Sequence, residues 1–474
     1  MSNITRRQFV KYTAAAGAAY SLGFPALIRA QGVNEKLQVA FIAAGGRASG
    51  HTGYCHKAGL QCVAFAEVDK NRWDGVQGKA GWENVPGYTD WRKVFEKHGK
   101  QIDVVFVATP DHNHFAPTMT AVSMGIHCYT EKPLTWSVRE AQLLAAAYAK
   151  NPKVVTQMGN QGHAGEGWRK AYEYIKAGAV GDVVEFHTWT NRPVWPQGYK
   201  RPTYSDPVPE NLDWDAWIGP APMRPFIAKY REGDDIAKDD VGQSIYHPFA
   251  WRGIVDFGSG ALGDMACHTT DGIYAIMNPG YAATAEPIRM TNPVGDQWPK
   301  GMVVKSTYRA KDGRPGFTTF WYEGRDENGN RIFPEAPEEL SSQGRPMKLP
   351  STGNLIYGTK GKMLVEEDYW NRARLLPLER HKEFGEPKQL LERSPGHHEE
   401  FIMACKGEKP REFSQSNFGY SGPMAANIQL GNLCARAGKK LELNEAGKII
   451  SDPKINDLAW REPRDGWGPL EMKV

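Results

Sequence analysis

The sequence predicts an α/β protein in which a doubly wound parallel sheet is followed by a second α/β domain. Two observations predict this fold. Short, nearly continuous apolar runs alternate with helical stretches from residue 37 to residue 160, which is the pattern of parallel strands joined by right-handed crossovers. In addition, 474 residues are too many for one ordinary hydrophobic core, so the chain has room for two domains.

Residues 1–30 predict an export signal rather than a part of the fold. Arg6 and Arg7 form a basic pair, Phe9 follows two positions later, and an alanine-rich run leads to a small-residue exit near Ala30. This order resembles a twin-arginine signal peptide; a flexible basic tail and a membrane anchor are the alternatives. The apolar run is shorter than the roughly 18 residues that span a bilayer, as is every other apolar run. We therefore expect a periplasmic protein, exported by the twin-arginine machinery, without stable membrane insertion.

The composition is that of a globular protein without a nucleic-acid partner. Residues 1–30 hold four basic and no acidic side chains, which accounts for the formal net charge of +4 and leaves the rest of the chain near neutral. No lysine or arginine stripe of the nucleic-acid-binding kind follows. The 6 cysteines show neither a CxxC pair nor metal-ligand spacing. We expect buried free thiols, although an oxidising compartment would permit disulfides.

Five apolar runs predict the parallel strands of the first domain. Each ends in a polar or glycine-rich segment, and they lie at 37–46, 61–69, 102–110, 126–133 and 153–160. Such sheets bind ligands beyond the carboxyl ends of their strands. We therefore expect a Rossmann dinucleotide-binding domain over 36–160 and a substrate-binding and oligomerisation domain over 161–474.

The first run ends in a glycine-rich turn that approximates the dinucleotide-binding motif. In AAGGRASG, Ala43 takes the place of the first glycine, Gly45 is the central glycine and Ala48 takes the third position. We expect pyrophosphate contacts from Ala43, Gly45, Gly46, Arg47 and Ala48. Glu67 ends the second run at the distance of a ribose-binding acid and would repel a 2′-phosphate, which favours NAD over NADP. An ordinary tight turn is the alternative.

Polar clusters follow the third and fourth runs. Thr109, Pro110, His112 and His114 come after the third, and Glu131 and Lys132 precede a proline at the end of the fourth. We expect these six residues at the nucleotide crevice, with Lys132 able to hold a substrate hydroxyl. The two histidines and the aspartate that precedes them lack the further ligands that a zinc site needs, so we expect no metal.

The fifth run and a tryptophan-rich stretch predict the substrate side. The segment GNQGH closes the fifth run, and a stretch rich in tryptophan, proline and arginine covers 188–204 and continues toward residue 252. The candidate substrate-binding residues are Asn160, Gln161, His163, Arg169, Trp251 and Arg252. Aromatic platforms with planar hydrogen-bonding groups suit a carbohydrate or a cyclic polyol. The alternative for Asn160, Gln161, His163 and Arg169 is that they cap a loop. The alternative for the tryptophans is that they pack as a lid.

The segment DFGSGALGDMACHTTDG places Asp264 and His268 four residues apart in a run of helix formers. Positions i and i+4 share one face of a helix, so a carboxylate and an imidazole would project the same way from a glycine-rich entry. This geometry suits an active site, and it also occurs in ordinary surface pairs.

These motifs together resemble the glucose-fructose oxidoreductase, inositol dehydrogenase and rhizopine-catabolism (Gfo/Idh/MocA) family. Their order is AxGxxA, an acid after the second strand, TPDHxH, EKPL and then GDMxxH, and the resemblance covers 36–474. It implies a C-terminal α/β domain with an open, largely antiparallel sheet that often forms a dimer face, so we expect a homodimer or homotetramer. It also implies that Lys132, Asp264 and His268 are the catalytic residues.

The predicted chemistry is hydride transfer from a secondary alcohol to NAD. An imidazole titrates nearest neutral pH and suits a base, so His268 takes the hydroxyl proton. Lys132 would stabilise the developing alkoxide, and Asp264 would bind a neighbouring hydroxyl or steady the imidazolium. We expect an NAD-dependent sugar or polyol oxidoreductase. The alternatives are a redox-neutral, NAD-dependent glycoside-cleaving lyase or hydrolase that retains its cofactor, and a non-catalytic nucleotide-binding protein.

Overall fold

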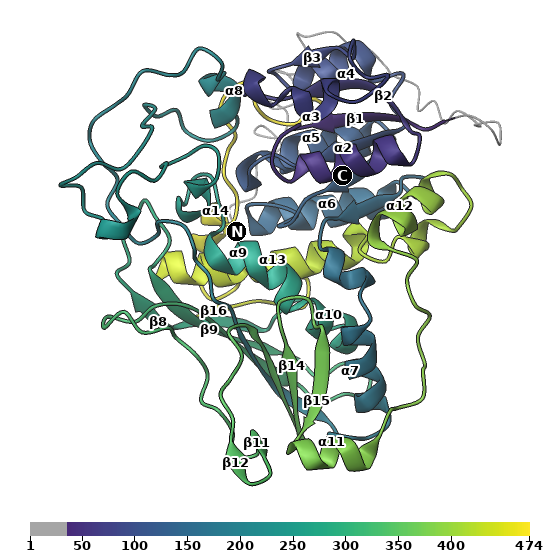
Figure 1. The fold of residues 1–474 in the computed structure, drawn as a ribbon, viewed down its shortest axis with the longest axis vertical. Helices are drawn as coiled ribbons and strands as arrows, with labels where there is room; N and C mark the ends of the chain where they lie inside the picture. Colours follow the sequence, from purple (N-terminus) through teal and green to yellow (C-terminus); the bar gives the residue numbers. More distant parts are fainter. Residues whose placement is uncertain (1–35) are drawn as a thin grey trace.

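The computed structural model describes residues 36–474 and contains the two α/β units that the sequence predicts (Figure 1). The twin-arginine prediction lies outside the described residues. In the first unit a six-stranded parallel sheet has the order β3-β2-β1-β4-β5-β6. Its strands are β1 Gln38–Ile42, β2 Gln61–Ala66, β3 Gly87–Tyr88, β4 Val104–Val107, β5 His127–Thr130 and β6 Thr156–Met158.

The helices of the first unit follow the strands as crossovers. They are α2 Ala48–Lys57, α3 Asp74–Gln77, α4 Arg92–His98, α5 Phe115–Ser123 and α6 Val138–Lys150. The sequence encodes the start of α6 directly. Ser137 accepts a hydrogen bond from the Glu140 backbone, and the Glu140 side chain returns to the Ser137 backbone, so two free helix donors are satisfied.

The second unit is built on an eight-stranded sheet with the order β15-β14-β13-β7-β10-β9-β8-β16. Only the β7–β10 pair is parallel, which confirms the open, largely antiparallel sheet. The strands are β7 Val183–Trp189, β8 Thr284–Thr291, β9 Gly301–Tyr308, β10 Phe317–Gly324, β13 Gly353–Gly358, β14 Gly361–Glu366, β15 Arg372–Leu376 and β16 Leu441–Glu442. A separate hairpin joins β11 Ser341–Ser342 and β12 Arg345–Pro346.

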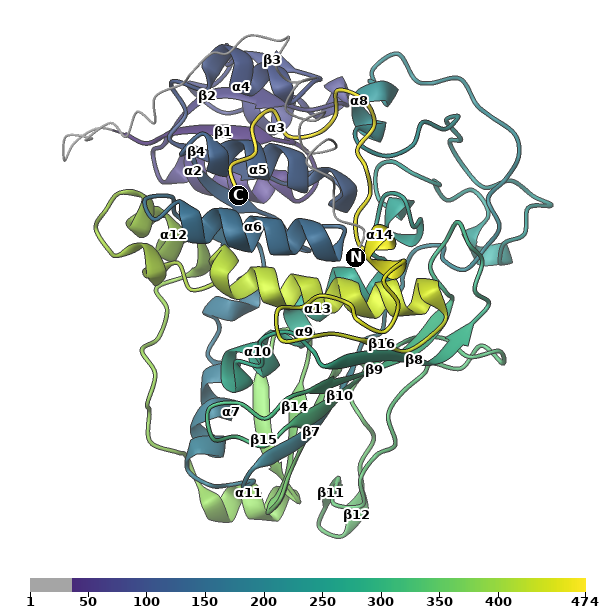
Figure 2. The same cartoon turned by 180° about the vertical axis from the view of Figure 1, so that it is seen from behind.

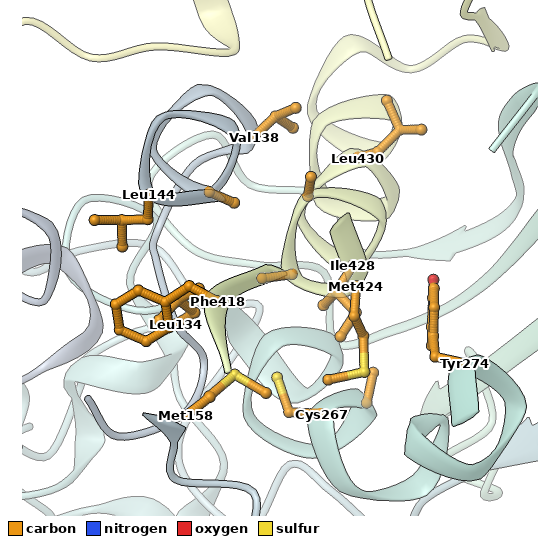
Figure 3. Packing of buried hydrophobic residues seen from close by; sticks show 14 of the residues in the cluster. Leu134, Val138, Leu144, Met158, Cys267, Tyr274, Phe418, Met424, Ile428 and Leu430 are labelled. Carbon is orange, nitrogen blue, oxygen red and sulfur yellow. The ribbon is translucent and has the colours of Figure 1, made fainter. Parts of the chain in front are cut away.

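The long helix α13 joins the two units. It runs from Phe418 to Ala437 and packs against α6 of the first unit and α9 of the second, as seen from behind in Figure 2. Figure 3 shows this core, where Leu144 of α6 and Met424 of α13 are fully buried beside Cys267. The remaining helices are α7 Gly167–Lys176, α8 Trp214–Ile218, α9 Gly260–Thr269, α10 Asp271–Met277, α11 Leu378–Phe384, α12 His397–Cys405 and α14 Ile455–Leu458.

Residues 190–258, which we call the aromatic insertion, connect β7 to α9 with little regular structure beyond α8. Trp214 stacks on Trp217, and both lie in a buried cluster with Phe257. Much of the tryptophan-rich stretch therefore serves packing, as one of the two interpretations predicts. The insertion lies beside the first unit in both views of the chain (Figures 1 and 2).

All 6 cysteines are buried and unpaired, which confirms the expected free thiols. Within 36–474 there is no helix long and apolar enough to cross a bilayer. The same residues contain no group of three or more potential ligands placed to hold a metal ion.

Candidate active site

A cavity of about 600 Å³ lies where the first unit, α9 and the aromatic insertion meet. Its volume falls in the range of small-molecule and cofactor sites. The carboxyl ends of β1, β2, β4 and β5 open into it, at the edge where a doubly wound sheet binds its ligand. We call the part beside the glycine-rich turn the nucleotide end, and the part between α9 and the insertion the substrate end.

The glycine-rich turn has the conformation that a dinucleotide loop requires. Ala43 stands at φ 103°, in the positive region that glycine favours, and Gly46 stands at φ 55°. A Cβ on Gly45 would lie 2.6 Å from Cδ of Arg72, so any larger residue here would have to displace the Arg72 side chain. Helix α2 begins just after the turn without a side-chain cap from the described residues. Its first three N–H groups donate to carbonyl oxygens of the turn, so an anion here would be favoured by the positive end of the helix dipole. The turn therefore fits a pyrophosphate.

Glu67 organises the same turn. Its Oε2 atom accepts hydrogen bonds from the backbone N–H groups of Ala44 (2.9 Å) and Gly45 (3.1 Å), and its Oε1 atom accepts one from Asp69 (3.0 Å). The carboxylate lines the cavity at the end of β2. The acid is thus placed for a ribose diol and also fixes the turn that precedes α2.

A charged network connects the turn to the end of β5. Glu131 Oε1 accepts hydrogen bonds from Nε of Arg47 at 2.8 Å and from Nε2 of His51 at 2.9 Å. Burial alone would raise the pKa of Glu131, but His51 and Arg47 outweigh it and hold the pKa well below its usual range. Glu131 is therefore a carboxylate that orients Arg47, and Arg47 and Glu131 both line the cavity.

The structure corrects the prediction for the two histidines after β4. Thr109 and Pro110 line the cavity, but His112 and His114 do not. The ring nitrogens of His112 lie 3.2 and 3.1 Å from the carbonyl oxygens of Phe257 and Trp217, and those of His114 lie 2.7 Å from two carbonyl oxygens. Both rings are buried and used in holding neighbouring loops, so they cannot contact a cofactor.

Lys132 and Asp264 form the centre of the substrate end. Nζ of Lys132 donates to Oδ1 and to the backbone oxygen of Asp264, each at 2.8 Å, and Nε of Arg252 donates to the same Oδ1 at 3.1 Å. Burial alone would raise the pKa of Asp264, but the two cations hold it well below its usual range. Burial alone would lower the pKa of Lys132, but the Asp264 charge raises it. The pair is therefore ionised, with the ammonium fixed in the cavity wall.

His268 lies one turn after Asp264 on α9 and also lines the cavity. Its Nδ1 atom has no hydrogen-bond partner among the described residues, and the ring meets the Tyr369 ring edge-on at 4.8 Å. Burial, followed by the charge of Lys132, lowers the pKa of His268 to about 3. The imidazole is therefore neutral and able to accept a proton. Asp264 and His268 are both buried in a site, so the surface-pair interpretation is wrong.

Three of the six predicted substrate residues line the cavity, namely Gln161, Trp251 and Arg252. The structure corrects the other three. Asn160 Nδ2 and His163 Nδ1 lie 2.9 and 3.0 Å from carboxylate oxygens of Asp271, and Arg169 donates to the His163 backbone oxygen at 2.8 Å. These side chains are buried in a network behind the cavity wall, where they support the segment that carries Gln161.

Sequence reasoning missed several residues of the substrate end. Its wall also includes residues from the aromatic insertion and one from the loop after β14, namely Arg192, Val194, Trp195, His247, Phe249 and Tyr369. None belongs to a motif with a chemical spacing. The tryptophan-rich composition of 188–204 was the one sequence signal for part of this set.

Comparison with known proteins agrees with this geometry. Residues 37–159 match the Gfo/Idh/MocA model described as "Oxidoreductase family, NAD-binding Rossmann fold", and residues 184–339 match the one described as "Oxidoreductase family, C-terminal alpha/beta domain". Inositol 2-dehydrogenase 1 of Saccharopolyspora erythraea is 28% identical over 27% of this chain and 38% of its own length. A glycosyl hydrolase family 109 protein of Shewanella pealeana is 23% identical over 32% of this chain and 34% of its own length. The matches thus span little more than a third of either relative.

A solved structure with the same fold is the WlbA dehydrogenase of Bordetella pertussis, in complex with NADH and UDP-GlcNAcA. It superposes with a TM-score of 0.55 at 13% identity and covers 86% of this chain and 99% of its own. At this identity the likeness establishes the fold: a Rossmann domain followed by an α/β domain with an open sheet.

Proposed function

The chain belongs to the Gfo/Idh/MocA family of NAD-binding oxidoreductases, and from that membership we propose that it oxidises a secondary hydroxyl of a carbohydrate or cyclic polyol. One observation carries the proposal. The ionised Lys132–Asp264 pair and the neutral imidazole of His268 face one cavity from adjacent positions, at the edge of the sheet where the family binds its dinucleotide. The similarity to an inositol dehydrogenase and to the WlbA dehydrogenase solved with UDP-GlcNAcA supports the substrate class.

The nucleotide end of the cavity fits NAD. The bare backbone at Gly45 and the uncapped start of α2 suit the pyrophosphate, and Glu67 suits the adenosine ribose. When bound, NAD supplies the hydride acceptor at its nicotinamide ring. The role left to the protein is to align the substrate carbon and to manage the hydroxyl proton.

The three side chains divide that role. Lys132 donates a hydrogen bond to the reacting oxygen and stabilises the negative charge that develops there. His268 accepts the hydroxyl proton, because its lowered pKa keeps the ring neutral. Asp264 fixes Lys132 through Oδ1, whereas its Oδ2 atom accepts no hydrogen bond from the described residues and can take a neighbouring substrate hydroxyl. This assignment gives Asp264 a positioning role as well as the predicted binding role.

A steady-state assay on a panel of sugars and cyclic polyols tests the proposal. Turnover with added NAD should release NADH, measured at its absorbance band, together with a keto product. The His268→Ala variant should bind NAD without producing NADH. If wild-type protein binds NAD but oxidises no member of the panel, that result contradicts the proposal.

A second candidate is a redox-neutral reaction with retained cofactor, and contacts of the insertion favour it. Next to Glu67, Asp69 receives a hydrogen bond from Asn211 at 2.6 Å and pairs with His247 at 3.0 Å, and the Lys70 N–H donates to the Asn211 carbonyl. These hydrogen bonds join the insertion to the segment after β2, on the adenosine side of the cavity. We infer that they slow the exchange of a bound dinucleotide. The glycosyl hydrolase name of one relative is in keeping with such chemistry.

The proposed export makes cofactor retention useful. We propose, from residues 5–11, that the twin-arginine route carries the folded protein to the periplasm, where free NAD is not expected, and that the protein works as a homodimer or homotetramer. An enzyme there would have to regenerate NAD in place, by reducing a second carbonyl or by returning the hydride to the same sugar. Extraction of nucleotide from purified protein, followed by turnover without added NAD, distinguishes this cycle from an ordinary dehydrogenase, which would purify empty and need free NAD.

A further inference from the structure

The cationic side chains around the cavity differ in how their charge is balanced. Four of the five lie within ion-pair distance of a carboxylate, in the pairs Arg47–Glu131, Arg72–Asp69, Lys132–Asp264 and Arg252–Asp264. Lys132 and Arg252 share the single charge of Asp264, which leaves this trio with a net charge of +1. The fifth cation is Arg192.

Arg192 has no carboxylate within ion-pair distance among the residues that the structure describes. Its side chain donates instead to the amide oxygen of the neighbouring Asn191. Its backbone is held firmly, because the Arg192 carbonyl accepts a hydrogen bond from the Gly324 N–H at 2.9 Å, at the end of β10. Arg192 therefore lines the cavity from a backbone position that is hydrogen-bonded to the end of β10.

The surroundings of Arg192 do not cancel its charge. The Asp368 carboxyl group interacts with the Arg192 charge from beyond ion-pair distance. Burial raises the pKa of Asp368, and the Arg192 charge acts to lower it. Asp264 also acts on Asp368, so all three groups belong to one charge neighbourhood at the substrate end. His268 is neutral there. The residues that line the whole cavity include five arginine or lysine side chains and four carboxyl groups, so a ligand meets one more cationic than acidic group.

The wall beside Arg192 leaves room for a ligand. Val194 and Phe249 line the cavity with 56% and 46% of their surface exposed, so they offer an apolar face that a ligand can cover. The guanidinium of Arg252 stacks over the Phe249 ring at 4.5 Å and over the Trp251 ring at 4.3 Å. An apolar face next to an unpaired cation suits a sugar ring that carries an anionic substituent.

We propose that the substrate of this site is an acidic sugar, and that Arg192 binds its carboxylate. The inference rests on the proposed function for the hydroxyl chemistry and adds the substrate class. A single planar guanidinium matches the two oxygens of a carboxylate. Lys132 and Arg252 are both held by Oδ1 of Asp264, so among the described residues that line the cavity Arg192 is the one arginine or lysine without a carboxylate contact; glucose 6-phosphate tests the phosphate alternative.

The test uses pairs of sugars that differ only at C6, so that the charge is the single variable. The pairs are glucose with glucuronate, galactose with galacturonate and mannose with mannuronate, and glucose 6-phosphate is the phosphate probe. Wild-type protein should show a kcat/KM at least about 10-fold higher for the uronate in the pair whose ring it accepts, since hydrogen bonds to charged groups commonly contribute this much or more.

Two variants and one control locate the effect. Arg192→Gln should lower kcat/KM much more for the uronate than for its neutral partner and so remove most of the uronate preference, and Arg192→Lys should restore part of the preference. Arg325→Gln is the matched control, because Arg325 is an exposed arginine at the end of the same β10 edge and bonds to the Gly329 carbonyl outside the cavity. It should leave the preference unchanged.

Binding separates this inference from the proposed function. Calorimetric titration of the NADH-loaded protein with glucuronate, galacturonate and mannuronate should show Arg192-dependent binding of at least one of them, even if no sugar is oxidised. That combined result would refute the proposed function and support the acidic-sugar site. Equal or better use of neutral sugars, equal losses for both members of a pair in Arg192→Gln, preference for glucose 6-phosphate, or no uronate binding would each overturn the inference.

Discussion

The two ends of the cavity are built differently. The nucleotide end consists of strand ends from one parallel sheet, and its side chains Glu67, Glu131 and Arg47 are bound to one another or to the backbone of the glycine-rich turn. The substrate end is assembled from Lys132 after β5, α9, the aromatic insertion and the loop after β14, and it contains the His268 ring and an arginine that forms no ion pair with the described residues. The common fold thus dictates cofactor binding, and the parts added to it leave polar groups available for a substrate.

The largest expected effect is a loss of turnover, caused by a change at the substrate end, without a loss of NAD binding at the nucleotide end. His268→Ala should lower kcat by about 10² to 10⁴, because it removes a positioned base. The Kd for NAD should change less than about 3-fold, since His268 belongs to the substrate end. Lys132→Ala should be comparably damaging. Wild-type turnover in His268→Ala would show that the base lies elsewhere.

A change of Glu67 should affect the nucleotide end alone. We expect wild-type protein to prefer NAD over NADP by at least about 1.4 kcal/mol, a factor of ten in affinity, because the carboxylate repels a 2′-phosphate. Glu67→Ser should narrow this gap and weaken NAD binding, since the N–H groups of Ala44 and Gly45 lose their acceptor. Titration of apo protein with both cofactors measures the preference. Equal affinities in the wild type would remove Glu67 from the ribose site.

A smaller effect concerns strain in the glycine-rich turn. Ala43 adopts φ 103° where the motif has glycine, so Ala43→Gly should raise the free energy of unfolding by about 1 kcal/mol. The adjacent change Ala44→Gly is the control and should lower it, because Ala44 is buried and lies outside the positive-φ region. Urea unfolding of both variants checks the pair. A destabilised Ala43→Gly would show that the alanine side chain contributes packing that outweighs the strain.

The smallest expected effect is the absence of a pH dependence. A neutral His268 is the active form, and its pKa is lowered from 6.5 to about 3, so protonation should not reduce activity until the pH falls far below 5. The pH profile of kcat/KM should therefore show no acidic limb between pH 5 and the ordinary histidine value. An acidic limb near 6.5 that disappears in His268→Gln would show that the ring is solvated in the working enzyme.

Local patterns predicted the nucleotide end better than the substrate end. Gly45, Glu67 and Glu131 follow directly from strand ends, because the fold places every such end at one edge. The same reasoning failed for His112 and His114, since position near a strand end does not reveal that a ring turns inward to carbonyl groups. These are long-range contacts, and no local pattern encodes them.

The substrate end shows the same limit. Asp264 and His268 were recognisable from their helical spacing, whereas Tyr369 and Arg192 reach the cavity through the topology of the second sheet. The sequence predicted an open, largely antiparallel sheet only through the resemblance of its motifs to a known family. It did not predict that Asn160 and Arg169 would be buried behind the wall, because that depends on the partner Asp271 and on the backbone around His163.

Hydride transfer within this cavity is the central claim, and a single-turnover experiment tests it most directly. NAD-loaded protein is mixed rapidly with each sugar of the panel, uronates included, and absorbance at the NADH band is recorded within one turnover. Both the dehydrogenase and the redox-neutral cycle require NADH to form, so wild-type protein should produce the band with at least one substrate, and His268→Ala should not. A saturating substrate that is consumed by NAD-loaded wild-type protein with no NADH formed at any time would contradict the account.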